Sequence, residues 1–315
     1  MFRNKKVYSY LLKSLGVILF LIIISKINFS KLLKILYNYE IVFPLVITIL
    51  LLIFSYYLKA LRWKIICQGY SINISNSKSF VLFLIGTFLG FTTPGRVGEL
   101  FRANYISENR NSFQNSLVTV ISDRAFDLLS LLILAIFSSF FLESKYHFLK
   151  DFFVLKENMT FQIIIFSVLM ASIIALLLVN KKNSFLKKIK HKIVGLLTNF
   201  KAIKVSFNQL MLMLIYTLLS LIIGYGLFYY LAISIGVKID FLEILSISIL
   251  VSFIQLIPVS ILGIGTRDIT LIYFFHLQGL STELAVSLSF LVLIANLIAT
   301  TPGMILFLSY RKKST

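Results

Sequence analysis

Residues 79–99 read SFVLFLIGTFLGFTTPGRVGE, an uncharged run that ends in a proline and a glycine and passes directly into charged residues. Proline removes a helical hydrogen bond and glycine relaxes the limits on the backbone, so we expect this run to break before it crosses a bilayer as one helix. Irregular backbone is tolerated in hydrocarbon only where protein or a water-filled cavity covers it. The run therefore predicts a broken or re-entrant helical hairpin whose tip points into the protein.

The composition of the chain excludes most soluble classes of protein. Of its 315 residues, 58% are hydrophobic and 14% are charged, whereas a soluble domain carries about 25% charge. Too little polar surface remains to cover a soluble globule, and the single cysteine, Cys67, cannot form an internal disulfide. We therefore predict an all-α, polytopic membrane helical bundle and exclude an ordinary soluble enzyme, a disordered tail and a disulfide scaffold.

Eight apolar elements are long enough to reach across or into a bilayer. The first follows a basic N-terminus but lacks a small-residue cleavage site, so we expect an uncleaved helix. The connections leave no room for a soluble domain, and we predict a single integral membrane domain over residues 1–315. The elements are residues 8–25, 41–58, 79–95, 111–142, 160–179, 205–237, 244–266 and 284–310.

The net charge of +19 is explained by membrane topology better than by nucleic acid binding. Lysines and arginines lie between the apolar runs, as is typical of cytoplasmic loops, and no nucleic-acid motif accompanies them. If all eight elements crossed, the strongly basic loop 180–204 would lie on the opposite side from the basic N-terminus. We therefore expect six crossings and two re-entrant hairpins in the cell membrane, with both termini cytoplasmic.

A second broken element has the same features as the first. Residues 252–268 read SFIQLIPVSILGIGTRD, again an apolar run, a proline, glycines and then an arginine beside an acid. The halves 1–157 and 158–315 would each hold two crossings, a broken element and one further crossing, which predicts an inverted internal repeat. Broken segments at matching places in two halves indicate a transporter's binding site. The alternative is that two Pro/Gly interruptions match by chance.

Ionisable residues beside the two breaks are the candidate binding residues, because such groups at membrane depth face the bundle interior or a water path. Arginine suits phosphate since its planar fork donates two parallel hydrogen bonds. A half-helix that starts near either glycine pair would point N–H groups at the same anion. The predicted binding residues are Pro94, Gly95, Arg96, Gly98, Glu99, Arg102, Asp123, Arg124 and Asp127 in the first half and Gly263, Gly265, Thr266, Arg267 and Asp268 in the second.

Each charged group also has a structural explanation that stays open. The acids and the arginine at 123–127 would suit a lock between helices. The charged series at 96–102 would suit a snorkelling surface at the cytoplasmic interface.

Other polar residues are assigned to the membrane interface or to packing. Lys59, Arg62 and Trp63 are expected to form an interfacial end of the second element. The histidines lack metal-ligand spacing, so we expect no metal and no cofactor. Helix packing is the expected role of Tyr56, Tyr225, Gln255 and Asn296.

The motifs resemble those of the lysylphosphatidylglycerol synthase transmembrane (flippase-like) family. The family pattern P-G-x-x-G-E is matched by residues 94–99, and E-R-x-x-D is matched by residues 123–127 with Asp123 in place of glutamate. The pattern P-x-x-x-G-x-R-E is matched from Pro258 to Asp268, with a longer proline-to-glycine spacing and with aspartate at its end. The resemblance spans nearly the whole chain, and its first motif is the most specific.

The resemblance implies an integral membrane domain that moves or presents anionic lipids. In the fused synthases, aminoacyl transfer lies in a separate soluble domain, so we expect lipid translocation here and not lysyl transfer. Arg96, Arg102 and Arg267 would bind phosphate in a midplane cavity, and the neighbouring acids would orient them or carry protons. The expected partners are the bilayer, an anionic phospholipid or lipid-linked phosphate, and a membrane synthase, but no nucleic acid.

Two rival functions stay open. One is a membrane enzyme that transfers a group to or from a polyprenyl- or phospholipid, which would need an external catalytic carboxylate. The external acids Glu143, Asp151 and Glu157 are scattered among lysines, which disfavours this reading. The other rival is a non-catalytic subunit that assists a separate lipid-modifying synthase.

Overall fold

A computed structural model describes residues 40–107, 113–146, 205–256 and 263–311, together with Ser30 and Tyr37. Two predicted apolar elements, 8–25 and 160–179, lie outside the described residues, as do the basic loop 180–204 and Pro258. The described residues up to Ser139 and those from residue 205 onward belong to one compact unit. A second unit, 140–203, is described only over the end of one helix.

Helices make up the regular structure of the described residues, which contain no strand. The all-α prediction is therefore confirmed. The elements are α3 (Val42–Gly69), α4 (Asn76–Phe91), the 3-10 helix η1 (Pro94–Phe101), α5 (Arg102–Ser107), α6 (Phe113–Tyr146), α10 (Phe207–Ser234), α11 (Phe241–Ile254), α12 (Thr266–Leu277) and α13 (Thr282–Arg311).

Helix length separates two classes of element. In the described ranges, α3, α6, α10 and α13 are each long and apolar enough to span a membrane. By contrast, α4 has 16 residues and α11 has 14, and a span needs about 20. The prediction of a polytopic membrane bundle is confirmed, and the two short apolar helices are the two elements that the sequence marks as broken.

The first break lies where the proline and glycine predict it. Helix α4 begins at the N-cap Ser75, whose side chain accepts a hydrogen bond from the Lys78 amide. It ends at Phe91, and Thr93 is extended before Pro94 starts η1. Arg96 then adopts φ of 55°, a left-handed conformation that a side-chain-bearing residue rarely takes. The chain reverses here, so that η1 and α5 pack back on α4.

The second break is followed by a helix where the sequence predicts one. The apolar element expected over residues 244–266 is divided, because α11 ends at Ile254 and the half-helix expected near Gly265 is α12, which begins at Thr266. Gly263 and Gly265 have φ of 74° and 87° and turn the chain before α12. Asp268 then accepts a hydrogen bond from the Gly265 amide at 2.7 Å. A new helix starts here because this carboxylate satisfies an amide that the turn leaves free.

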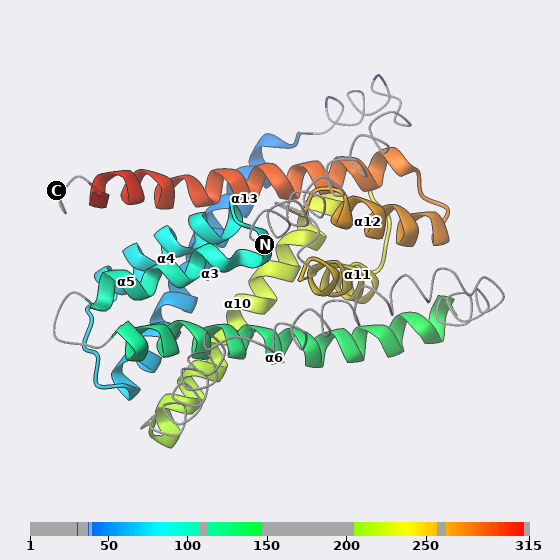
Figure 1. Ribbon diagram of the computed structural model, residues 1–315. Helices are drawn as coiled ribbons and strands as arrows, with labels where there is room; N and C mark the ends of the chain where they lie inside the picture. Colours follow the sequence, from blue (N-terminus) through cyan, green and yellow to red (C-terminus); the bar gives the residue numbers. More distant parts are fainter. Residues whose placement is uncertain are drawn as a thin grey trace, which may run out of the picture. The chain divides into compact units, whose positions relative to one another are not determined.

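Helix α13 packs against both broken elements (Figure 1). Its C-terminal half lies beside α4, where a Cβ on Gly303 would be 2.2 Å from the Leu84 carbonyl oxygen. Its N-terminal half lies beside α12, and Ser289 bonds to Arg267 there. Helix α3 packs on α4, α10 and α13. The two hairpins are thus held along a common helix.

Candidate functional site

Two glycines on α4 let the first hairpin close tightly. A Cβ on Gly86 would be 2.5 Å from Cγ of Arg102, and one on Gly90 would be 2.4 Å from Cγ of Glu99. Because both glycines lack that atom, η1 and α5 lie directly on the α4 backbone. Glu99 and Arg102 are thereby fixed in the interior, at 3% and 0% exposure.

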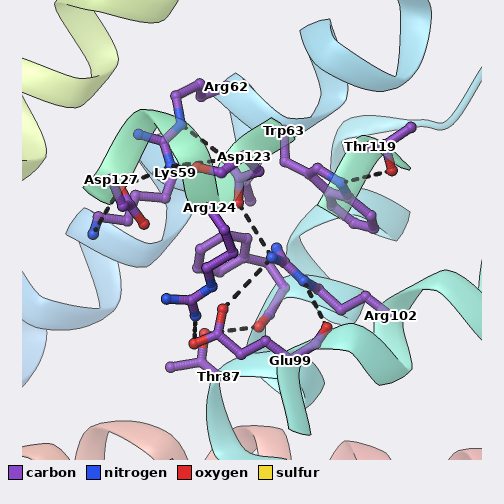
Figure 2. A network of polar contacts seen from close by, with 12 residues as sticks. Lys59, Arg62, Trp63, Thr87, Glu99, Arg102, Thr119, Asp123, Arg124 and Asp127 are labelled. Carbon is purple, nitrogen blue, oxygen red and sulfur yellow. Dashed lines mark hydrogen bonds and ion pairs between the residues drawn. The ribbon is translucent and has the colours of Figure 1, made fainter. Parts of the chain in front are cut away.

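A deep layer of charges connects this hairpin to α3 and α6 (Figure 2). Asp123 of α6 is its centre. Nε of Arg62 donates to Asp123 Oδ1 at 2.9 Å, and Nη2 of Arg102 donates to Asp123 Oδ2 at 3.2 Å. Arg62 also donates to Oγ1 of Thr217 on α10 at 3.0 Å. One carboxylate thus joins two fully buried arginines from separate elements.

Two aromatic rings stabilise the Arg102 guanidinium. Its Cζ lies 4.7 Å from the Trp63 ring centroid and 4.6 Å from that of Phe83. In the described part of the chain, Nη1 of Arg102 has no hydrogen-bond partner. Cation–π attraction to the rings compensates for part of that loss. Trp63 is held in turn by a 3.2 Å hydrogen bond from Nε1 to Thr119.

An outer layer of charges covers the deep one. Lys59 Nζ lies 3.5 Å from Asp127 Oδ1, and Nη2 of Arg62 lies 2.9 Å from the same oxygen. Arg124 pairs with Glu99. The side chains of Lys59, Arg124 and Asp127 keep 21–23% exposure, unlike the deep layer.

Arg96 adds a further cation to the outer layer. It is exposed and lies within electrostatic range of Lys59 and Arg124. Within the described ranges it has no ion-pair partner. The left-handed backbone at Arg96 stores strain, and such strain is concentrated at functional sites.

The two layers differ in charge balance. In the deep layer, Arg62 and Arg102 face two carboxylates, those of Glu99 and Asp123. The outer layer has three cations, Lys59, Arg96 and Arg124, and one carboxylate, Asp127. Buried charges that are paired form a rigid structure and bind little else. Because Glu99 also pairs with Arg124 and Asp127 also pairs with Arg62, the two layers are counted together: five cations face three carboxylates, which leaves an excess of two positive charges.

The second predicted group forms its own centre on α12 and α13. Nε of Arg267 donates to Oγ of Ser289 at 2.6 Å, and this hydroxyl donates to Oδ1 of Asp268. Both charged residues are 4% exposed. Thr266 donates to the Gly263 carbonyl at 3.4 Å. The second group is therefore a capped helix start joined to α13 by a serine.

The two groups have different partners among the described residues. Arg102 and Arg124 pair with Glu99 and Asp123 of the first group, and Arg267 bonds to Ser289. That the two groups face one cavity stays a prediction.

The predicted residues of the first half fall into three roles. Arg96, Arg124 and Asp127 lie in the outer layer, whereas Glu99, Arg102 and Asp123 lie in the deep layer. Arg102 was expected to bind phosphate, but its guanidinium is enclosed by carboxylates and rings. The backbone positions are Pro94 and Gly95, which open η1, and Gly98, whose amide donates to Oγ1 of Thr93 at 2.8 Å.

Sequence reasoning missed Lys59, Arg62 and Trp63, which it placed at the membrane interface. Arg62 and Trp63 are fully buried, and Lys59 belongs to the outer layer. They leave the interface because Asp123 and Asp127 of α6 pair with Lys59 and Arg62, and because Arg102 of α5 lies over the Trp63 ring. The i, i+4 spacing of Gly86 and Gly90 is a signal for a different contact, the close approach of Glu99 and Arg102 to α4.

The described residues contain no group of three or more His, Cys, Asp or Glu side chains that could hold a metal ion.

Most of the chain is similar to a known family of membrane proteins. The model of the family described as "Lysylphosphatidylglycerol synthase TM region" matches residues 10–303. A UPF0104 membrane protein of Pyrococcus horikoshii is 31% identical over 128 residues. That stretch covers 39% of this chain and 38% of the relative, so well under half of each is aligned. No solved structure matches the chain.

Proposed function

The chain belongs to the lysylphosphatidylglycerol synthase TM-region family of membrane proteins, which is linked to lipid handling, and on that premise we propose that it translocates an anionic lipid. The lipid's phosphate binds at the outer layer of charges beside the first hairpin. The observation that carries the proposal is the excess of two cations over the carboxylates of the two layers, with Arg96 exposed and without an ion-pair partner in the described ranges.

Arg96 and Arg124 are the proposed phosphate ligands. Both are arginines, whose guanidinium forks match two phosphate oxygens. Arg96 is exposed, and the side chain of Arg124 is 23% exposed. Lys59 adds a third positive charge within electrostatic range of Arg96 and Arg124. The deep layer holds these groups in position, because Asp123 fixes α3, α5 and α6 to one another.

When no lipid is bound, the Glu99 carboxylate forms an ion pair with Arg124. A phosphate that reaches Arg124 replaces one carboxylate partner by another anion, so the guanidinium stays paired throughout. An arginine without any anion would be costly at this depth. Exchange of partners therefore keeps the barrier to lipid entry and release low.

The two broken elements are proposed to be re-entrant hairpins in an inverted repeat of residues 1–157 and 158–315. Two observations support this: α4 and α11 are too short to span, and each is followed by a turn and a second helix. The Arg267 centre is then the counterpart of the first site in the other half. We propose that the protein lies in the cell membrane with both termini cytoplasmic, which is the arrangement that the basic loops favour.

The test is leaflet exchange in reconstituted vesicles. Labelled phosphatidylglycerol in phosphatidylcholine vesicles is followed after the wild-type protein, Arg96→Gln, Arg124→Gln or Lys238→Gln is inserted. Lys238 is an exposed cation before α11, so its variant is matched in charge but lies outside the site. We expect exchange with the wild type and with Lys238→Gln, and a loss of about tenfold or more in the other two, since one charge-assisted hydrogen bond contributes that much.

Exchange no faster than in protein-free vesicles, for several anionic headgroups, would overturn translocation. If the wild type binds phosphatidylglycerol without moving it, the subunit alternative gains support. In that case the protein would present the lipid to a separate synthase, the kind of enzyme for which the family is named.

A further inference from the structure

We infer that the lipid at the outer layer carries an uncharged, hydroxyl-bearing headgroup, which Tyr56 of α3 and Tyr225 of α10 select. This inference rests on the proposed function and adds the chemical class of the group that follows the phosphate. From the sequence alone, only a packing role is expected for the two tyrosines. In the structure, both lie within electrostatic range of Arg96.

Tyr56 lies beside the outer layer on α3. It precedes Lys59 by three residues, and residues with this spacing are neighbours on one face of a helix. Lys59 in turn pairs with Asp127 (Figure 2). Tyr56 is half-buried, so its ring is packed while part of its surface stays accessible. Its hydroxyl is therefore within reach of a headgroup whose phosphate binds Arg96.

Tyr225 approaches the same place from the second half of the chain. It is half-buried and lies within electrostatic range of both Arg96 and Asp127. Helix α10 packs along α3, and its Ser220 carbonyl accepts a hydrogen bond at 3.3 Å from Ser55, the residue before Tyr56. The two tyrosines thus border the outer layer from two helices that are in contact.

Both phenolic hydroxyls are hydrogen-bonded to neutral side chains of the second half. Tyr56 donates to Oδ1 of Asn296 on α13 at 3.4 Å, and Tyr225 is hydrogen-bonded to Ser252 on α11. The Ser252 hydroxyl donates to the Ser248 carbonyl at 2.9 Å, so toward Tyr225 it can only accept. Each tyrosine thus directs its proton to the protein. Its oxygen can still accept a hydrogen bond, and no donor within the described ranges does so.

These two acceptors determine which headgroup fits. A phosphate oxygen only accepts hydrogen bonds, so the partner of a phenolic oxygen must be a hydroxyl or an ammonium group of the lipid. The two layers have five cations and three carboxylates, and an ammonium group would be repelled by the excess of positive charge. A neutral hydroxyl is not repelled. The arrangement therefore fits a phosphate that carries a polyol, such as glycerol or a sugar.

Competition between two lipids that differ only in hydroxyl groups tests the inference. Phosphatidylpropanol has the charge and the carbon skeleton of the phosphatidylglycerol headgroup but lacks its hydroxyls. The purified full chain in detergent is titrated with equal amounts of both, with identical acyl chains, and bound lipids are counted by native mass spectrometry. The variants are Tyr56→Phe and Tyr225→Phe, which keep the ring and remove the phenolic oxygen.

Each variant has a matched control on the same helix. Tyr57 packs edge-on against Phe80 with 5.3 Å between ring centroids, and Tyr229 packs edge-on against Phe241 at 5.1 Å. Tyr57→Phe and Tyr229→Phe therefore remove a hydroxyl from half-buried rings that another aromatic ring holds.

We expect the wild type and both controls to prefer phosphatidylglycerol over phosphatidylpropanol by about tenfold, since one or two net hydrogen bonds are gained. Tyr56→Phe and Tyr225→Phe should each reduce this preference to about threefold or less, with binding of phosphatidylpropanol unchanged. Phosphatidylethanolamine should bind the wild type no better than phosphatidylcholine does. Equal binding of phosphatidylglycerol and phosphatidylpropanol by the wild type, an unchanged preference in either tyrosine variant, or binding of phosphatidylethanolamine as tight as that of phosphatidylglycerol would overturn the inference.

The same titration separates this inference from the proposed function. If phosphatidylglycerol and phosphatidylpropanol bind equally but both outcompete phosphatidylcholine, the phosphate site stands and the hydroxyl assignment fails. If phosphatidylpropanol binds no better than phosphatidylcholine but phosphatidylglycerol outcompetes both, the hydroxyl assignment stands and the phosphate site fails.

Discussion

Arg62 and Asp123 show what decides whether a charged side chain in an apolar helix is buried or exposed. Arg62 lies near the C-terminal end of an apolar helix, where an arginine normally reaches the membrane interface. Here its guanidinium is fully buried between Asp123, Asp127 and Thr217. The sequence alone could not indicate this, because Asp123 is 61 residues away. Burial of Arg62 is favourable only because α6 places Asp123 and Asp127 beside its guanidinium.

The losses from removing the two members of this pair should not add. Arg62→Met leaves Asp123 with Arg102 alone, and Asp123→Asn leaves Arg62 with Asp127 alone, so each variant removes one partner from a buried charge, and we expect a loss of about 3 kcal/mol in the free energy of unfolding. The double variant should lose clearly less than the sum of the two. Unfolding in mixed micelles measures all three. Additive losses would contradict a direct pair and leave each residue with an independent role.

Glu99 provides a second test at the scale of one residue. Glu99→Gln removes the carboxylate that pairs with Arg124 but keeps the size of the side chain. The cation excess of the site rises by one charge, so phosphatidylglycerol should bind more tightly, by up to about tenfold. Lipid titration followed by native mass spectrometry measures this. Weaker binding with unchanged stability would mean that Glu99 helps to hold the lipid and does not compete with it.

At the scale of elements, both breaks could be predicted, and so could the start of α12. Pro94 and the glycines after residue 262 interrupt the backbone whatever surrounds them, so the pattern is sufficient. The hydrogen bond from the Gly265 amide to Asp268 then fixes the first turn of α12. The close packing of η1 and α5 on α4 was missed, although Gly86 and Gly90 carried the signal.

Glycine substitutions test the packing of the first hairpin. A Cβ on Gly98 would lie 2.1 Å from the Leu89 carbonyl oxygen, which is backbone and cannot yield, whereas one on Gly224 meets nothing. Gly98→Ala should therefore lower the free energy of unfolding by about 1–3 kcal/mol. Gly224→Ala should leave stability unchanged or raise it slightly, since alanine favours helix. Equal stability of the two variants would exclude the tight hairpin.

At the scale of the whole molecule, the sequence predicted the class of fold but not the partners of its buried charges. Hydropathy and length identify α3, α6, α10 and α13 as spans because the bilayer fixes both quantities. The partner of Arg267 depends on how α12 packs on α13. Ser289, which holds Arg267, carries no sign of that role in the sequence.

Cysteine accessibility tests the proposed re-entrant topology. The native Cys67 is buried, so a single introduced thiol can be read against a low background. Ser77 and Asn104 flank the first hairpin, and Lys238 and Thr282 flank the second. With a membrane-impermeant maleimide, Ser77→Cys and Asn104→Cys should react from one face, and Lys238→Cys and Thr282→Cys from the other. If Ser77→Cys and Asn104→Cys react from opposite faces, the first hairpin crosses the bilayer and the inverted repeat is wrong.

The central claim is that unbalanced cations beside the first hairpin bind an anionic headgroup, and competitive lipid binding tests it most directly. Purified protein in detergent is titrated with equal amounts of phosphatidylglycerol and phosphatidylcholine, and bound lipids are counted by native mass spectrometry. We predict that the wild type and Lys238→Gln prefer phosphatidylglycerol by about tenfold, as one additional charge-assisted contact provides, and that Arg96→Gln and Arg124→Gln lose this preference while keeping their thermal stability. No preference in the wild type, or an equal preference in all four proteins, would contradict the account.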